Sequence, residues 1–177
     1  RSRCSMIGPG GENLVRYACV MNETKDAAGR SGLGAVMGSK KLKAIAVRGA
    51  LGLDGADPDK IREMARDLAR GVQAGELAAG MHKYGTGAHL EDFIPVGNLP
   101  IRNFRDGEFP AAADISANTI LEKIGQGMEA CYACAVRCKK AVKTGAPYNV
   151  DPDYGGPEYE TIGSLGSCCG VEDIEAI

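Results

Sequence analysis

Three cysteines that lie close together constrain this chain more than any other feature. Cys131, Cys134 and Cys138 are separated by steps of three and four residues. On a helix with about 3.6 residues per turn, these steps place all three sulfurs on one face. The spacing therefore predicts a short helical segment on which the three thiols converge.

Three convergent thiols favour an iron–sulfur site, because a cubane cluster usually takes four cysteine ligands and this segment supplies three. Two other interpretations stay open. A structural zinc site usually takes two ligand pairs well apart in the chain, but the other close pair is Cys168 and Cys169. Neighbouring residues in a regular element point away from each other, so that pair suits zinc poorly. Buried cysteines without any ligand are also common.

A glycine-rich segment at residues 29–40 is the second informative stretch. Its spacing matches neither the P-loop nor the dinucleotide-binding fingerprint. Glycines beside Arg30 and Ser31 would let backbone amides approach an anionic ligand, and the guanidinium would supply a forked donor. A glycine-rich turn that packs on a neighbouring segment explains the same residues, and both interpretations stay open.

The rest of the chain predicts a mixture of strands and helices, with a domain boundary at about residue 52. Residues 80–112 are dense in turn residues and are expected to be mostly irregular, although they hold the two histidines, His82 and His89, as general-base candidates. The expected elements are a strand at 43–48, a helix from Asp57 and Pro58 to about Gly75, a helix at 117–124 capped by Ser116, a helix opening at 156–161 and a further helix beginning at 173–175.

Basic residues follow the cysteines, and two interpretations of them stay open. They form either a solvated face or a positive rim that offsets cluster charge or docks an acidic electron carrier. These residues are Arg137, Lys139, Lys140 and Lys143.

Composition excludes several classes of protein. The net charge of -2 argues against a nucleic-acid surface, and no apolar run is long enough to predict a membrane span. The seven cysteines are not spaced as a disulfide framework, which favours a reduced, cytoplasmic setting. Because the chain opens on Arg1 in what looks like the middle of a fold, we expect it to be an internal part of a longer protein.

Three motifs occur in order along the chain: Gly-Arg-Ser-Gly-Leu-Gly-Ala-Val-Met-Gly-Ser-Lys at 29–40, the three cysteines, and Gly-Pro-Glu-Tyr-Glu-Thr at 156–161. Together they closely resemble the aldehyde ferredoxin oxidoreductase family of tungsten-pterin, iron–sulfur enzymes. The resemblance implies an α+β fold. Residues 1–52 would end a mainly β N-terminal pterin-binding domain, and residues 53–177 would begin a mainly α-helical, cluster-binding domain.

The resemblance also implies the roles of particular residues. The pterin would be contacted by Arg30, Ser31, Leu33 and Gly34. Cys131, Cys134 and Cys138 would be three ligands of a [4Fe-4S] cluster, and the fourth cysteine would lie beyond Ile177. An acidic residue beside the metal would be Glu160 or Glu158, of which the resemblance favours Glu160.

The activity implied is oxidation of a small aldehyde to a carboxylic acid at a tungsten (or molybdenum) bis-pterin centre. Electrons would leave through the cluster to ferredoxin or a similar electron carrier, and the full-length protein would be a homo-oligomer or a subunit of a complex. Two alternatives remain: the catalytic subunit of a benzoyl-CoA reductase-type tungsten enzyme, in which Cys168 or Cys169 could bind the metal, and an iron–sulfur electron-transfer module without pterin.

Overall fold

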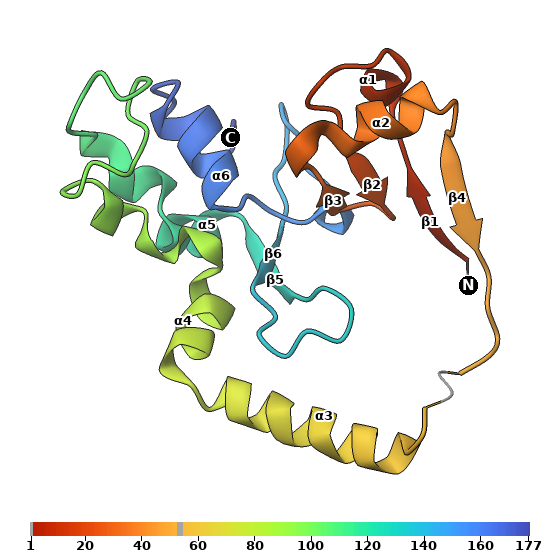
Figure 1. Cartoon of the computed structure of the whole chain (residues 1–177). Coiled ribbons are helices and arrows are strands. Elements are labelled where there is room, and N and C mark those ends of the chain that lie inside the picture. The colour runs from red at the N-terminus through yellow and green to blue at the C-terminus, as the bar shows by residue number, and fades with distance from the viewer. Residues whose placement is uncertain (1, 53–54) are drawn as a thin grey trace. The chain divides into compact units, whose positions relative to one another are not determined.

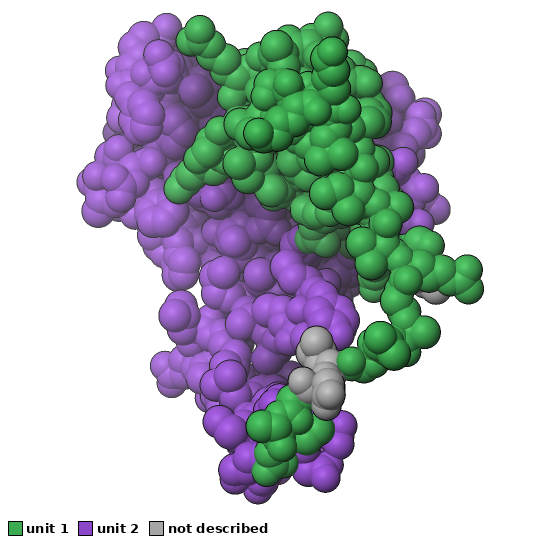
Figure 2. All heavy atoms as spheres, turned by 45° about the vertical axis from the view of Figure 1, so that its right-hand side comes forward, with its two compact units in different colours: residues 1–58 green, residues 59–177 purple. Residues whose placement is uncertain are grey.

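The structure is a computed structural model that describes residues 2–52 and 55–177. The chain divides into two compact units, residues 1–58 and residues 59–177, which Figure 2 shows in different colours. The predicted start of the second domain, at residue 53, lies outside the described residues. Helices and strands are both present in the chain, as the α+β prediction required.

The first unit contains a four-stranded sheet in the order β3-β2-β1-β4, in which all three pairings are antiparallel. In the inner strand β1 (Arg3–Met6), Met6 pairs with Met21 of β2 on one side and with Ala44 of β4 on the other. The strand predicted at 43–48 is confirmed as β4 (Figure 1). The elements of this unit are β1 (Arg3–Met6), α1 (Pro9–Glu12), β2 (Val20–Asn22), β3 (Asp26–Ala28), α2 (Leu33–Ser39) and β4 (Ala44–Val47).

The long helix α3 (Pro58–Gln73) confirms the helix predicted from Asp57 and Pro58. Proline at the first helical position costs no hydrogen bond, because that amide has no partner inside a helix. Apolar residues of this helix are exposed to solvent, since Ile61 and Leu68 are 57% and 70% accessible. Among the described residues of α3, none is buried.

The second unit continues with short helices around a two-stranded antiparallel sheet (Figure 1). Ser116 caps α5 as predicted, because its Oγ accepts the Thr119 N–H at 3.4 Å. The elements are α4 (Glu76–Tyr84), α5 (Ala117–Lys123), β5 (Gly125–Glu129), β6 (Lys139–Val142) and α6 (Tyr159–Thr161), with single-turn 3₁₀ segments between them and a π-helical turn, Ile162–Ser167, that continues α6.

The hydrophobic core of the second unit gathers side chains from turns as much as from helices. Leu90, Ile101, Ile115, Ile120 and Ile162 are each no more than 2% exposed. A hydrogen bond from the buried Ser167 joins the π-helical turn to the core: its Oγ donates to the Pro100 carbonyl at 2.8 Å. Gly156, at the start of the segment that leads into α6, packs against Lys140 and Val142 of β6.

Three predicted elements differ from the structure. The region expected to be irregular from residue 80 begins inside α4. Residues 173–175 form a turn rather than a helix, with the Asp173 side chain accepting the Glu175 N–H at 3.0 Å. The third difference concerns the cysteines and is described with their site. Within the described residues, no helix has the length and apolar character needed to cross a membrane.

Candidate iron–sulfur and cofactor sites

The three clustered cysteines lie on the loop that joins β5 to β6, which we call the cysteine loop (residues 130–138; Figure 1). The predicted helix is wrong. Ala133 and Arg137 have φ angles of 55° and 56°, and the left-handed region is incompatible with a right-handed helix. The segment instead folds as successive turns, the first closed by the Cys134 N–H, which donates to the Cys131 carbonyl at 3.1 Å.

The turns of this loop direct backbone amides toward a sulfur. Amides of Arg137 and Val136 donate to Cys134 and lower its pKa, because hydrogen bonds to a thiolate favour the charged form. A hydrogen-bonded thiolate is what a metal or cluster requires of its ligand. The chemistry of this loop therefore fits the ligand role predicted for its cysteines.

Cys138 lies in a different environment from Cys134. Burial raises the pKa of Cys138, and the nearby charges of Glu158, Cys134 and Cys131 raise it further. The three thiols are thus close enough for their charges to interact. Within the described part of the chain, however, no group of three potential ligand side chains converges on one metal position. Charge interactions reach further than coordination bonds, so the three sulfurs are neighbours without sharing a centre.

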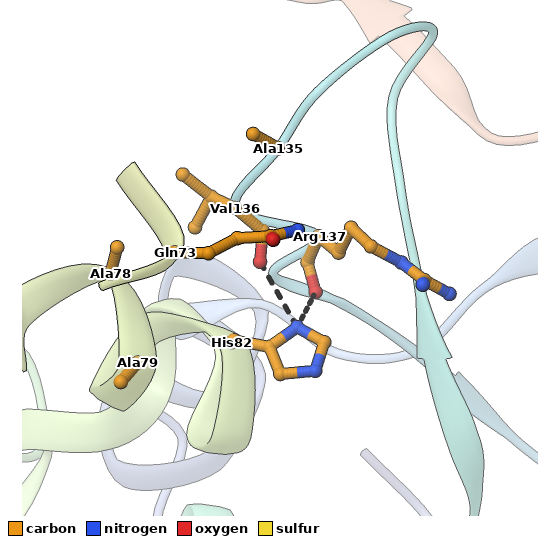
Figure 3. A pocket seen from close by; sticks show the side chains of 7 residues that line it. All are labelled: Gln73, Ala78, Ala79, His82, Ala135, Val136 and Arg137. Carbon is orange, nitrogen blue, oxygen red and sulfur yellow. Dashed lines mark hydrogen bonds between the residues drawn. The ribbon is translucent and has the colours of Figure 1, made fainter. Parts of the chain in front are cut away.

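His82, on α4, anchors the cysteine loop from outside. Its Nδ1 lies 3.0 Å from the Val136 carbonyl and 3.1 Å from the Arg137 carbonyl, and both are acceptors, so this nitrogen carries the proton (Figure 3). These groups border a cavity of about 300 Å³ lined by Gln73, Ala78, Ala79, His82, Ala135, Val136 and Arg137. The sequence offered His82 as a general-base candidate; the structure gives it an anchoring contact.

The two glutamates of the Gly-Pro-Glu-Tyr-Glu-Thr motif have different environments. Glu158 is half-buried at the N-terminal cap position of α6 and accepts a hydrogen bond from the Thr86 hydroxyl. That hydroxyl in turn accepts the Tyr159 N–H at 2.9 Å. Glu160, which the family resemblance favoured, is exposed in the first turn of the helix. The structure thus brings Glu158, rather than Glu160, into the electrostatic environment of Cys138.

The basic residues after the cysteines do not form a single solvated face. Arg137 and Lys143 are exposed, but Lys140 is only 1% exposed. Burial lowers the pKa of Lys140, whereas the charges of Glu158 and Cys138 act in the opposite direction. Neither interpretation of the sequence predicted that Lys140 would be buried, because a series of basic residues does not indicate which side chain lies in the interior.

The glycine-rich segment 29–40 folds as a 3₁₀ turn (Arg30–Gly32) followed by α2. Its glycines are needed for packing: a Cβ at Gly34 would lie 2.5 Å from the Cys19 carbonyl oxygen, and one at Gly38 would overlap the Gly11 carbonyl. Gly32 has a φ of 66°, which favours glycine. The packing interpretation therefore explains these three glycines.

The candidate ligand-binding residues of the same segment are exposed. Arg30, Ser31 and Leu33 face solvent, whereas Gly34 is buried. Among the described residues, none forms an ion pair with Arg30, so its guanidinium is available to an anion. Ser31 has a φ of 72°, an unusual conformation for a residue with a side chain. The turn thus presents a free cation and a hydroxyl, which suits the predicted phosphate-bearing cofactor.

Comparison with known proteins assigns both units to one family. Residues 63–177 match the family model "Aldehyde ferredoxin oxidoreductase, domains 2 & 3". Residues 1–49 match "Aldehyde ferredoxin oxidoreductase, N-terminal domain". The chain belongs to the aldehyde ferredoxin oxidoreductase family. The resemblance carried by the three sequence motifs is thereby confirmed.

Relatives within the aldehyde ferredoxin oxidoreductase family include tungsten enzymes. The chain is 40% identical over 175 residues to the tungsten-containing aldehyde ferredoxin oxidoreductase of Thermococcus kodakarensis and 36% identical over 176 residues to that of Pyrococcus furiosus. It is 32% identical over 177 residues to an aliphatic sulfonate oxidoreductase, WOR-like subunit, of Pyrococcus furiosus. These alignments cover 97%, 99% and 97% of the chain. The chain spans 27% to 28% of the length of these relatives.

A solved structure resembles the fold as well. The active-site complex of a benzoyl coenzyme A reductase, determined with 1,5-dienoyl-CoA, superposes with a TM-score of 0.60 at 25% sequence identity. The match covers 82% of the present chain and 24% of the solved one. A structural neighbour of the chain is therefore an enzyme complex that holds a dienoyl thioester rather than an aldehyde.

Cys168 and Cys169, which the benzoyl-CoA reductase-type alternative would place on the metal, follow the π-helical turn. Cys169 is exposed, and its thiol donates to the Ser164 carbonyl at 3.2 Å. Cys168 is half-buried, and its amide donates to the Gly163 carbonyl at 2.9 Å. Both contacts are local to the turn, so they assign neither thiol to a metal.

Proposed function

We propose that the full-length protein oxidises aldehydes to carboxylic acids at a tungsten bis-pterin centre and passes the electrons through a [4Fe-4S] cluster to ferredoxin or a similar carrier. The observation that carries the proposal is the match of both units, in order, to relatives named as tungsten-containing aldehyde ferredoxin oxidoreductases. When bound, the tungsten centre would supply Lewis-acid and two-electron redox chemistry.

The residues of the cysteine loop would hold the cluster. Cys131, Cys134 and Cys138 supply three thiolates, and the amides directed at Cys134 stabilise the charged form that a ligand needs. The neutral thiol favoured at Cys138 would lose its proton on binding iron, because metal binding to cysteine displaces protons. His82 would hold the cysteine loop against α4 through its hydrogen bonds to the Val136 and Arg137 carbonyls.

Residues of the other two motifs would position the cofactor and move a proton. Arg30 and Ser31 would bind phosphate oxygens of the pterin, while Leu33 would pack on the pterin and Gly34 would keep the turn against its neighbours. Glu158 would accept a proton that the oxidation of aldehyde and water releases and pass it to solvent, since it is half-buried and oriented by the Thr86 hydroxyl. Glu160 remains the alternative for this role, but its exposed position supports it less.

The test combines analysis of metals and cofactors with a substrate panel on the full-length protein, purified without oxygen. We expect tungsten, pterin, iron and sulfide together, and reduction of ferredoxin or a viologen dye with aldehydes. Iron and sulfide without tungsten, molybdenum or pterin would contradict the proposal and identify an electron-transfer module.

A benzoyl-CoA reductase-type function is the second candidate, and the structural neighbour in complex with 1,5-dienoyl-CoA favours it. This enzyme would act on the ring of an aromatic thioester, with dearomatised dienoyl thioester as the product or the reverse substrate. Dye-linked oxidation of a dienoyl thioester, with no activity toward any aldehyde, would replace the first proposal by this one.

A further inference from the structure

Lys140 is a buried cation with no hydrogen-bond partner. It lies on β6 and is 1% exposed, and its Nζ is the buried side-chain nitrogen that lacks a partner among the described residues. An ammonium group held away from water costs several kcal/mol unless an anion compensates it. A cation in this position therefore indicates an anionic partner that the side chains of the described residues do not supply.

The path of the Lys140 side chain is fixed by two glycines. Its Cβ lies 3.1 Å from where a Cβ on Gly156 would be, so the stem passes close to that residue. The Lys140 Nζ lies against Gly85. A Cβ added to Gly85 would overlap this Nζ and would lie 2.9 Å from the Cys138 carbonyl oxygen. Gly85 has a φ of 70°, so conformation and space both require glycine there. The ammonium thus lies next to the end of the cysteine loop.

Two sources of negative charge lie near Gly85, where this ammonium ends, and one of them already has a partner. Glu158 is bound by Thr86, the residue after Gly85, and the cysteine loop ends at Cys138, whose carbonyl oxygen borders Gly85. Glu158 accepts the Thr86 hydroxyl through Oε2 and forms no ion pair with Lys140. The sulfur side of the cysteine loop is the remaining source of negative charge, and it is where the proposed cluster would add thiolates and sulfides.

We propose that Lys140 is a positioning residue for the iron–sulfur cluster: its ammonium binds the negative charge of the cysteine-loop thiolates and cluster sulfides and stabilises the reduced cluster over the oxidised one. This inference rests on the proposed function, because it needs the cluster. Reduction adds one electron and no proton to the cluster, so the reduced form carries one more negative charge. A neighbouring cation therefore favours the reduced form and raises the reduction potential.

The experiment is a redox titration of the cluster in full-length protein, followed by electron paramagnetic resonance. Lys140→Met keeps the length and apolar stem of the side chain but removes its charge. At the wild-type midpoint potential, we expect the ratio of reduced to oxidised cluster in Lys140→Met to fall about tenfold, which is about 59 mV for a one-electron couple. Lys143→Met is the matched control, because Lys143 is exposed one residue beyond β6, and its ratio should stay within about twofold of wild type.

A second measurement covers the case in which Lys140→Met does not hold its cluster. Wild-type protein labelled with ¹⁵N at lysine Nζ should show a ¹⁵N hyperfine coupling to the reduced cluster, because a hydrogen bond from Nζ to a cluster or cysteine sulfur transmits spin density. Absence of this coupling, or a Lys140→Met ratio within twofold of wild type, would overturn the inference.

The two proposals fail in different ways. Wild-type protein that contains iron and sulfide but shows no lysine coupling contradicts only the role of Lys140. Wild-type protein that contains no iron–sulfur cluster under anaerobic purification contradicts the proposed function itself, and the inference falls with it.

Discussion

Different forces hold the glycine-rich segment in the first unit and the cysteine loop in the second. At residues 29–40 the backbone packs directly on other backbone, and Gly34 and Gly38 are needed because a Cβ would overlap a carbonyl oxygen. At residues 130–138 hydrogen bonds hold the loop, from its own amides and from His82. The glycines of the first motif are thus explained by close backbone packing, whereas the cysteines of the second are explained by the ligand role predicted for them.

This difference predicts that the first segment tolerates no added atoms at the glycines that pack against backbone. Gly38→Ala should destabilise the full-length protein by about 3 kcal/mol or more, because the new methyl group would overlap the Gly11 carbonyl and neither backbone can give way. Guanidinium unfolding measures the change. Gly29→Ala in the same segment is the control: nothing lies within 4 Å of its Cβ position, and its unfolding free energy should change by less than about 0.5 kcal/mol. Equal stability of the two variants would show that packing does not fix this segment.

The cysteine loop should respond through its ligands rather than through its folding. Cys134→Ser should lower the iron content from about four atoms per chain to near zero, because one thiolate of the cluster is lost. Iron and sulfide assays on anaerobically purified protein measure this. Cys169→Ser changes an exposed thiol whose contact is local, and we expect its iron content to match that of wild type. A cluster that survives Cys134→Ser would remove this residue from the ligand set.

The anchor of the loop should have a smaller effect than its ligands. His82→Ala removes the donor to the Val136 and Arg137 carbonyls, and we expect a loss of about 1 kcal/mol in unfolding free energy with a several-fold faster loss of cluster to a chelator. His89→Ala is the matched control, since His89 contacts only its neighbour Asp92 among the described residues, at 2.9 Å. Indistinguishable rates for the two variants would mean that His82 does not position the loop.

The smallest effect is expected at the exposed pair of Arg105 and Asp106, which belongs to neither segment. Donation from Arg105 lowers the pKa of Asp106 below its ordinary value of 3.8. A carboxyl whose pKa is lowered in the folded state stabilises the fold at higher pH, and this stabilisation is lost as the pH falls below 3.8 through the folded pKa. Asp106→Asn should leave stability near pH 7 almost unchanged, because exposed ion pairs contribute little. A large loss at pH 7 would show that surface charge, rather than the two motif segments, dominates stability.

Sequence patterns identified elements wherever a local rule was sufficient. The strand at 43–48, the helix beginning at Pro58 and the helix capped by Ser116 were predicted because alternation, proline at the first position and a capping hydroxyl act within a few residues. The cysteine segment was predicted as a helix from spacing alone, and it is a loop. Left-handed residues such as Ala133 and Arg137 carry no sequence signal of the kind that glycine gives.

By itself, the sequence determined the family, because residue types in a fixed order carry that information through the spacing of three motifs; the ligand residues and the cofactors stay predictions from the same motifs. Only the tertiary structure decided which charged side chains lie inside. Glu158 rather than Glu160 is half-buried, and Lys140 rather than Lys143 is buried next to the end of the cysteine loop. Burial is set by contacts between residues far apart in the chain, here Gly85 and Gly156 around one lysine. No local pattern of charge records those contacts.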